Sequence, residues 1–350
     1  MKALLLVGGQ GTRLRPLTVH APKSIVPIFS RPFLHYQLDL IKQVPEIDEV
    51  ILSLNYQPDR IEAVFGDGAA AGIKLRYVVE PKPLGTAGAV RYAAEGVQDT
   101  LVVFNGDVLT QVDLQGLIDF HRQRRARATI VLTPVENPTA YGLVETDPQS
   151  NIVRFLEKPK PDEITCNTIN AGIYVLEPET FDRIPADVAW SIERSFFPSF
   201  IDRGETFLAS IYRDYWIDIG TPEKYMQVHR DIMDGRYSMP PFNGAPGVAW
   251  VAPTARVDAA ARLDGPLFVG DGCVVKAGAR LGPYTVLGRD SQVDEDANIS
   301  GTIVWPESRI GREAIVTDTI IGRSGQIGRN AQVRGGVFGD TTSVAEYSRL

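Results

Sequence analysis

The stretch Gly8-Gly9-Gln10-Gly11-Thr12-Arg13-Leu14-Arg15-Pro16-Leu17-Thr18 follows a short apolar run, Ala3 to Val7, that predicts a buried first strand. Three glycines in four positions let a backbone approach a ligand closely and turn its N–H groups toward it. Arg13, Arg15 and Lys23 add cations that suit phosphate oxygens. No Asp or Glu occurs before Asp39, although the chain carries a net charge of −7. These features predict a local polyphosphate site on an otherwise acidic protein.

Two better-known glycine loops do not fit this stretch. A dinucleotide-binding fingerprint needs a third glycine running straight into a helix, but Leu14 and Pro16 follow instead. A P-loop needs a glycine directly before its Lys-Ser pair, and none precedes Lys23-Ser24.

The chain shows two regions of different periodicity. In residues 1–235, apolar strand patterns alternate with helical patterns, which predicts a mostly parallel sheet covered by helices. The expected strands are Lys2–Val7, Glu49–Leu54, Lys74–Val79, Leu101–Asn105, Thr129–Val135, Leu143–Thr146, Ile152–Glu157 and Ile169–Leu176. The expected helices are Phe33–Gln43, Pro58–Phe65 and Thr86–Ala94. Ligands of such sheets lie beyond the carboxyl ends of the strands, where the glycine stretch and Asp107 both fall.

Beyond a Pro/Gly-rich stretch, expected to be a linker over residues 236–250, an aliphatic residue recurs every six positions. The series is Val251, Val257, Leu263, Val269, Val275, Leu281, Leu287, Val293 and Ile299, and it continues after two one-residue slips to Val333. Small residues recur four places after most of them. This period predicts a hexapeptide-repeat parallel β-helix over residues 251–350. All four histidines precede the repeat, so acyl transfer by a histidine base is not expected there.

The glycine stretch and the following Pro22-Lys23 resemble the signature of the sugar-nucleotide pyrophosphorylases. Further matching motifs are Glu80-Pro81-Lys82-Pro83-Leu84-Gly85-Thr86-Ala87-Gly88, Asn105-Gly106-Asp107, Tyr141-Gly142, Glu157-Lys158-Pro159, Asn170-Ala171-Gly172 and Trp216-Ile217-Asp218-Ile219-Gly220. The resemblance implies a Rossmann-like nucleotidyltransferase domain with a mixed sheet over residues 1–235, and a left-handed, three-sided β-helix. It implies attack of a sugar 1-phosphate on the α-phosphorus of an NTP, with pyrophosphate leaving.

The resemblance also assigns roles to residues. Asp107 and Asp218 are the expected Mg²⁺ carboxylates, since magnesium favours carboxylate and phosphate oxygens. Taken alone, Asp107 better suits a turn cap and Asp218 a surface strand residue; the glycine stretch favours the metal role for both. Arg13 and Lys23 are expected to hold the leaving pyrophosphate. The expected nucleotide contacts are Leu6, Gly8, Gly9, Gly11, Thr12, Arg13, Lys23, Gly85, Thr86, Gly88 and Asp107. The expected sugar-phosphate contacts are Gly142, Glu157, Lys158, Asn170 and Gly172.

The turn at Leu84–Gly88 and the hexapeptide tail look most like mannose-1-phosphate guanylyltransferases, which implies GTP and mannose 1-phosphate as substrates. Glucose-1-phosphate thymidylyl- or uridylyltransferase and heptose-1-phosphate guanylyltransferase remain alternatives. A catalytically silent paralogue that binds sugar nucleotide and regulates a partner is an alternative of another class.

Composition sets the remaining expectations. Two cysteines are too few for a disulfide framework or a zinc site. The acidic balance argues against nucleic-acid binding, and no stretch approaches the length of a membrane span. We therefore expect a cytoplasmic protein that forms a homo-oligomer through its β-helix.

Overall fold

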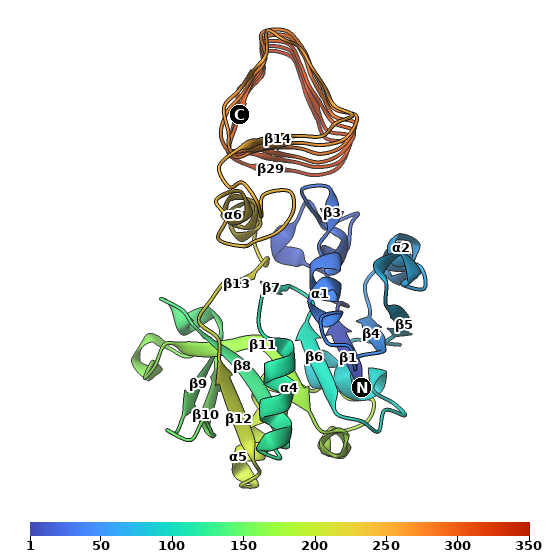
Figure 1. Cartoon of the computed structure of the whole chain (residues 1–350), viewed down its shortest axis with the longest axis vertical. Helices are drawn as coiled ribbons and strands as arrows, with labels where there is room; N and C mark the ends of the chain where they lie inside the picture. Colours follow the sequence, from blue (N-terminus) through green and yellow to red (C-terminus); the bar gives the residue numbers. More distant parts are fainter. The chain divides into compact units, whose positions relative to one another are not determined.

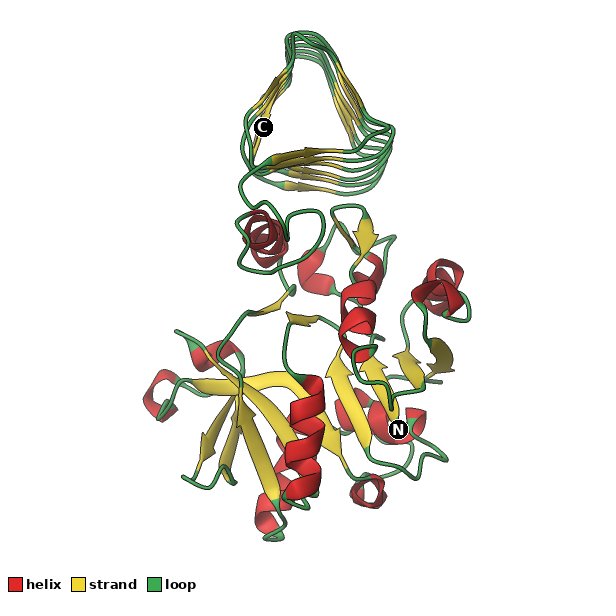
Figure 2. Cartoon of the chain, in the orientation of Figure 1, coloured by secondary structure: helices red, strands yellow, loops and turns green.

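The computed structural model describes residues 1–350, which form two compact units. The α/β unit comprises Met1–Gly9 and Leu34–Trp216, and the β-helix unit comprises Gln10–Phe33 and Ile217–Leu350. Figure 2 shows helices and long strands in the first, whereas short strands and turns dominate the second. The glycine-rich stretch therefore begins in one unit and continues in the other.

A mixed sheet forms the α/β unit, with strand order β10-β9-β11-β6-β1-β4-β5 and with β8 joining β11 to β12. Its strands are β1 (Lys2–Leu6), β4 (Glu49–Leu54), β5 (Lys74–Val79), β6 (Leu101–Asn105), β8 (Ala128–Pro134), β9 (Gly142–Thr146), β10 (Ile152–Glu157), β11 (Thr168–Leu176) and β12 (Phe207–Ile211), with the short β7 (Val108–Thr110) outside it. Strands β1, β4, β5 and β6 run parallel, and β11 pairs antiparallel with β6. The mixed sheet expected from the resemblance is confirmed.

The helices of the α/β unit are α1 (Leu34–Ile41), α2 (Pro58–Phe65), α3 (Gly85–Ala93), α4 (Leu114–Gln123) and α5 (Phe197–Asp202), with a π-helical turn at Ile192–Phe196 and short 3₁₀ turns between elements. Helix α4, which the sequence analysis did not predict, packs along β11 (Figure 1). It begins at Asp113, whose carboxylate accepts a hydrogen bond from the Gly116 N–H at 2.9 Å. Such a cap satisfies one of the donors left open at a helix N-terminus.

The central strands are apolar on both faces because helices and loops cover them. Every residue of β4 is buried, and Tyr174, Phe197 and Phe207 lie in the main core cluster. The ring centroids of Phe197 and Phe207 are 5.5 Å apart in a stacked arrangement, and Tyr174 meets Phe197 edge-on at 5.0 Å. This rigid core carries the strand ends that support the candidate site.

Three parallel sheets form the β-helix, which is triangular in cross-section (Figure 1). The first contains β14 (Ala249–Val251), β17 (Leu267–Val269), β20 (Thr285–Leu287), β23 (Ile303–Val304), β26 (Ile320–Ile321) and β29 (Val337–Phe338). The second contains β15 (Arg256–Val257), β18 (Val274–Val275), β21 (Gln292–Val293), β24 (Arg309–Ile310), β27 (Gln326–Ile327) and β30 (Ser343–Val344). The third contains β16 (Arg262–Leu263), β19 (Arg280–Leu281), β22 (Asn298–Ser300), β25 (Ile315–Thr317) and β28 (Gln332–Arg334).

The six-residue period corresponds to one sheet of this prism. Aliphatic side chains of the repeat fill its interior, and small buried residues such as Cys273, Ala279 and Ala297 line the turns between sheets. The hexapeptide-repeat β-helix is therefore confirmed.

The β-helix unit also holds η1 (Thr12–Leu14), η2 (Lys23–Ile25), the hairpin β2 (Pro27–Ile28) and β3 (Arg31–Pro32), and α6 (Pro222–Met233). Strand β13 (Trp216–Asp218) spans the boundary of the two units in the chain. Helix α6 begins with Pro222 after Thr221, whose side chain accepts from the Lys224 N–H, a favourable helix start. Within the segment expected to be a linker, Phe242 is 1% exposed and its ring lies 5.4 Å from that of Phe29, so this part of the segment packs against the unit.

Candidate active site

The carboxyl end of β1 is closely packed, with one open position. Leu6 pairs with β4 and β6, and a Cβ added to Gly8 would lie 2.8 Å from the Asn55 nitrogen. A Cβ added to Gly106 would lie 2.4 Å from the Leu6 oxygen. Gly9, in contrast, has no atom within 4 Å of its Cβ position. Gly9 therefore leaves its backbone accessible to a ligand, while Gly8 and Gly106 allow the strands to meet.

The turn that carries Asp107 is fixed by a buried amide. Gln37 of α1 is 3% exposed, and its Nε2 donates to the carbonyl of Asn105 at 2.9 Å and to that of Val108 at 3.0 Å. These two acceptors flank Asp107, which is half-buried at the end of β6. Its carboxylate therefore projects from an anchored turn.

A hydrogen-bond network lies at the start of β11. The Asn170 side chain accepts from the Gly172 N–H at 2.9 Å and donates to the Tyr174 hydroxyl at 3.0 Å. Gly172 has φ +77, and a Cβ there would meet the Asn105 amide at 2.9 Å. Asn170 thus retains hydrogen-bonding capacity for a ligand, but part of it is committed to holding this turn. Tyr174, which the sequence analysis missed, is fully buried, and burial raises the pKa of its hydroxyl well above the usual value.

The Glu157-Lys158 pair lies at the end of β10 on unusual backbone. Lys158 has φ +53, a conformation that side-chain-bearing residues rarely adopt, and its N–H donates to the Tyr141 carbonyl at 2.8 Å. Such strain persists only where the surroundings enforce it, and functional sites often contain it. Burial, followed by the nearby Glu193 carboxylate, raises the pKa of Glu157. A Cβ at Gly142 would lie 2.9 Å from the Phe155 ring and 3.1 Å from the Glu157 carboxylate, so a larger residue there would require both side chains to shift.

The start of α3 packs against a neighbouring loop. A Cβ at Gly85 would lie 2.8 Å from the Trp190 oxygen, and the same oxygen accepts from the N–H groups of Ala87 and Gly88. The Thr86 hydroxyl donates to Glu193 at 3.0 Å and accepts from the Ile192 N–H at 2.8 Å. Close packing of this loop is a structural reason for the small residues here. Nucleoside contacts by Gly85, Thr86 and Gly88 stay predictions.

Glu80 lies just before that turn, at the end of β5. Glu80 belongs to the motif Glu80–Gly88, but no role was predicted for it. Its carboxylate accepts from the Leu84 N–H at 2.9 Å and from the Ser53 hydroxyl at 3.3 Å. Burial raises its pKa, partly offset by these two hydrogen bonds. Two donors thus orient a half-buried acceptor beside the turn.

The β-helix unit carries the phosphate-binding candidates that follow Gly9. The Thr18 hydroxyl donates to the Gly11 carbonyl at 2.7 Å, which closes the loop around Thr12. Gly11 has φ +61, and a Cβ there would lie 3.2 Å from the Lys23 Cβ. The loop therefore brings the Gly11 backbone next to the base of the Lys23 side chain.

Arg13 and Asp218 meet beside Gly220. A Cβ at Gly220 would lie 2.9 Å from the Arg13 Nη2 and 2.8 Å from the Asp218 Oδ2. The Lys224 ammonium donates to the Asp218 Oδ1. Lys224 was missed, although its position in the first turn of a helix that follows Asp218 in sequence was a usable signal. Two cations and one carboxylate therefore share this corner of the unit.

The two expected metal carboxylates have the right chemistry for a divalent ion. Both are hard oxygen donors, and no group of three or more His, Cys, Asp or Glu side chains forms a metal cage in the structure. Magnesium is often bound by one or two carboxylates together with substrate phosphates, so a sparse donor set fits it. Asp107 belongs to the α/β unit and Asp218 to the β-helix unit.

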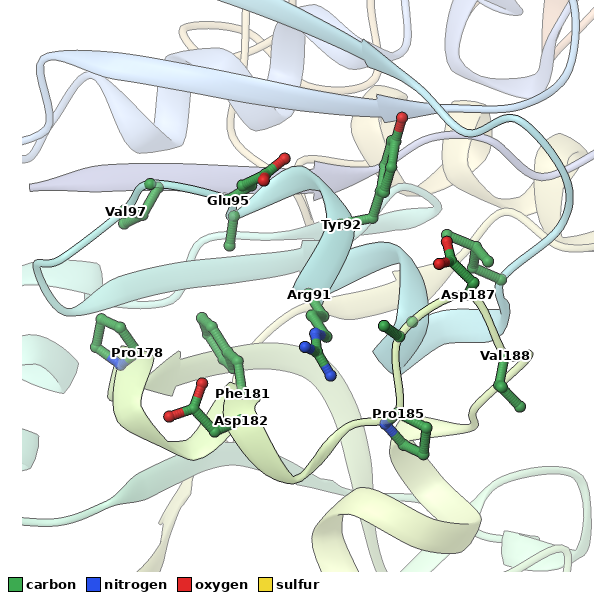
Figure 3. Close-up of a pocket in the computed structure, with 15 residues that line it drawn as sticks. Arg91, Tyr92, Glu95, Val97, Pro178, Phe181, Asp182, Pro185, Asp187 and Val188 are labelled. Carbon is green, nitrogen blue, oxygen red and sulfur yellow. The ribbon is translucent and has the colours of Figure 1, made fainter.

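A cavity of about 420 Å³ lies between α3 and the segment Pro178–Val188 (Figure 3). Arg91, Glu95 and Asp182 line it, as does Gly88, the only candidate site residue among its walls. The cavity therefore adjoins the turn at Leu84–Gly88, and none of the phosphate, metal or sugar candidates lines it.

Two family models match the chain. Residues 2–235 match the model described as Nucleotidyl transferase, and residues 263–349 match the model described as GMPPB C-terminal domain. No helix has the length and apolarity required to span a membrane.

Similar proteins support the same relationship. A mannose-1-phosphate guanylyltransferase of Mycobacterium tuberculosis is 42% identical over 81% of this chain and 77% of its own length. A UTP–glucose-1-phosphate uridylyltransferase of Synechocystis is 30% identical over 87% of this chain and 83% of its own length. The crystal structure of HddC from Yersinia pseudotuberculosis in complex with GMP-PN is 28% identical, with a TM-score of 0.56 over 66% of this chain and 99% of that one. The resemblance drawn from the motifs is thus confirmed: the chain belongs to the nucleotidyl transferase family and is a sugar-1-phosphate nucleotidyltransferase.

Proposed function

We propose that the protein makes GDP-mannose and pyrophosphate from GTP and mannose 1-phosphate, with Mg²⁺ as the metal ion. A phosphate oxygen of the sugar 1-phosphate attacks the α-phosphorus of the nucleotide. The bond from the α-phosphorus to the bridging oxygen breaks, and pyrophosphate leaves. No covalent enzyme intermediate is required, so alignment and charge neutralisation supply the catalysis.

The observation that carries the reaction class is the grouping of Arg13, Asp218 and Lys224 in the β-helix unit. Arg13 and Lys23 are suited to hold the β- and γ-phosphates and to stabilise charge on the departing pyrophosphate. Asp107 and Asp218 would hold the Mg²⁺ ion, which when bound offsets the repulsion between the two anionic substrates.

Residues of the α/β unit would hold the sugar phosphate. The Lys158 ammonium is suited to bind the phosphate of the sugar 1-phosphate. The left-handed backbone of Lys158 fixes the position from which its side chain extends. Glu157 and Asn170 offer acceptors and donors for sugar hydroxyl groups, and the glycines at 142 and 172 leave space beside them. Mannose is proposed from similarity to the mannose-1-phosphate guanylyltransferase of Mycobacterium tuberculosis.

Glu80 supports guanine as the base. A carboxylate offers two acceptor oxygens, and the Watson–Crick edge of guanine offers the N1–H and N2–H donors. Uracil and thymine instead present one N–H flanked by two carbonyl oxygens, which a carboxylate repels. The two hydrogen bonds from Ser53 and Leu84 orient Glu80 for such recognition.

A screen of pyrophosphate release tests the proposal. GTP, UTP, dTTP and ATP are each combined with mannose 1-phosphate and glucose 1-phosphate in the presence of Mg²⁺. GTP with mannose 1-phosphate should give the highest kcat/KM. A higher value with UTP or dTTP and glucose 1-phosphate would instead favour a uridylyl- or thymidylyltransferase. Absence of turnover with every pair, with sugar nucleotide still bound, would favour the silent regulatory paralogue.

A variant sharpens the assignment of the base. Glu80→Gln should lower kcat/KM for GTP by about tenfold, because a bidentate contact to a base is worth about 1–3 kcal/mol. Glu95→Gln, an exposed change in the neighbouring cavity, serves as the control and should leave GTP use unchanged. Equal GTP kinetics in both variants would remove Glu80 from base recognition.

The expected homo-oligomer also stays a proposal. Tyr347 and Leu350 at the carboxyl end of the β-helix are each 61% exposed, which leaves apolar surface for a second copy. Light scattering after gel filtration measures the molar mass, and a monomer at micromolar concentration would exclude this assembly.

A further inference from the structure

The segment Gln10–Phe33 lies on one sheet of the β-helix. The Phe29 ring is 4.9 Å from that of Phe268 in β17, and Phe29 is only 4% exposed. Pro16 lies beside Gly339, where a Cβ would be 3.1 Å from the Pro16 Cβ. Strand β17 and the strand before Gly339, β29, belong to the same sheet, which Figure 1 shows facing α6 and β3. Both ends of the segment that carries Arg13 and Lys23 therefore contact this face.

Tyr225 of α6 links the β-helix to the hairpin of that segment. Its hydroxyl accepts a hydrogen bond from the Trp305 Nε1–H at 3.0 Å and donates to the Pro27 carbonyl. Trp305 follows β23 on the same sheet and is 3% exposed, and Tyr225 is fully buried. One hydroxyl thus connects a β-helix coil to a residue close to Lys23 in the chain.

His229, one helical turn later, fixes the next part of the hairpin. Its Nδ1 lies 2.8 Å from the Tyr225 carbonyl, which assigns the proton to Nδ1 and leaves Nε2 as an acceptor. That nitrogen accepts from the Phe29 N–H at 3.1 Å. Phe29 has φ +55, a costly conformation for a phenylalanine that this bond and the surrounding rings support.

We propose that the β-helix is the platform of the phosphate-binding segment, and that Tyr225 and His229 are positioning residues that act through Pro27 and Phe29 on Lys23. The proposal rests on the role given above to Lys23 at the leaving pyrophosphate. The 3₁₀ turn Lys23–Ile25 precedes the anchored hairpin directly, so a shift of the hairpin moves the origin of the lysine side chain. Misplacement of a group by about 1 Å can cost about 100-fold in rate.

Tyr225→Phe removes the linking hydroxyl and keeps the buried ring. In the full-length protein we expect kcat for pyrophosphate release to fall about tenfold and KM for pyrophosphate in the reverse reaction to rise about tenfold. KM for sugar 1-phosphate should stay within twofold, because those contacts belong to the α/β unit. A structural role alone would lower the melting temperature without this division between the two substrates.

Tyr284→Phe is the matched control. Its hydroxyl donates to Asp234, just beyond α6, at 3.1 Å, so it also joins the β-helix to the end of α6 but does not reach the hairpin. The control should keep wild-type kcat and KM for pyrophosphate. Trp305→Phe should shift the same two constants as Tyr225→Phe by about threefold, and it carries the test if Tyr225→Phe does not fold.

Titration calorimetry with inorganic pyrophosphate and Mg²⁺ separates this proposal from the proposed function. If the wild type turns over no substrate pair but binds pyrophosphate more tightly than Tyr225→Phe does, the positioning role stands and the proposed reaction fails. If the folded Tyr225→Phe or Trp305→Phe variant matches the wild type in pyrophosphate affinity and in kcat, the platform role is overturned.

Discussion

The sugar-side and phosphate-side candidates are held in physically different ways. In the α/β unit, Asn170, Gly172 and Tyr174 are fixed by hydrogen bonds to one another within β11. In the β-helix unit, Arg13 and Lys23 lie on a loop segment with little regular structure of its own, which packs on α6 and on repeat strands. With the roles proposed above for Arg13 and Lys23, the repeat domain would contribute to catalysis by supporting the loop that carries them.

The first test of this comparison between the two units concerns the two expected metal carboxylates, Asp107 of the α/β unit and Asp218 of the β-helix unit. Asp107→Asn and Asp218→Asn should each lower kcat for pyrophosphate release by about 1000-fold, about 4 kcal/mol, because metal binding and preorganised charge are lost. Each variant should keep the wild-type melting temperature within a few degrees. Near-native turnover of either one at saturating Mg²⁺ would falsify its role as a metal ligand.

Acid should weaken the β-helix unit through His229. Burial lowers its pKa from 6.5 to about 4, so the folded protein keeps the imidazole neutral while the unfolded chain takes up a proton below pH 6.5. The free energy of unfolding should therefore decrease as pH falls from about 6.5 to about 4, and the total loss should reach about 3 kcal/mol.

Urea unfolding across this range, compared between the wild type and His229→Gln, isolates the contribution of the histidine. The variant should be less stable at pH 7, since it loses the packed ring beside Tyr225, but the difference should shrink toward pH 4. A difference that does not change with pH would show that the imidazole is already charged in the folded protein or that the unfolded chain does not titrate it there.

The division also predicts opposite kinetic signatures for cations of the two units. Arg13→Ala and Lys23→Ala should each lower kcat about 30-fold, about 2 kcal/mol, because a charged hydrogen bond to the leaving pyrophosphate is lost. Lys158→Ala should mainly raise KM for sugar 1-phosphate. If Arg13→Ala raised only that KM and kept kcat, Arg13 would belong with the sugar-side residues.

Periodic patterns predicted the regular parts of both units. Strands Glu49–Leu54 and Leu101–Asn105 have the predicted bounds, because buried parallel strands read as mostly apolar runs. The edge strand Lys74–Val79 also has the predicted bounds, although only Leu75 in it is buried. The six-residue period of the β-helix was equally direct, since each coil repeats the same sheet positions. Helix α4 was not predicted, although its buried residues Leu114, Leu117, Ile118 and His121 recur at the spacing of one helix face and offered a usable signal.

The tertiary contacts that hold the candidate site residues in place could not be predicted from the sequence in the same way. The contacts of Tyr225 with Pro27 and Trp305 join residues that are far apart in sequence and belong to no repeat. The packing of Gly85 against Trp190 is likewise set by a loop whose path has no periodic signal. Motif matches indicated which residues gather, but only the tertiary structure shows what holds them.

The smallest expected effect concerns the contact between the last coils and the signature segment. Gly339→Ala would place a methyl group 3.1 Å from the Pro16 Cβ, so Pro16 must move by a few tenths of an ångström. Pro16 lies three residues from Arg13, and we expect kcat to fall about twofold, about 0.4 kcal/mol.

Gly244→Ala is the control, because a Cβ there has no atom within 4 Å and the backbone is not left-handed. It should leave kcat unchanged and stabilise the fold by about 0.5 kcal/mol through the unfolded state. Equal kcat in the two variants, measured with saturating substrates, would show that Pro16 rests on the β-helix without transmitting its position to Arg13.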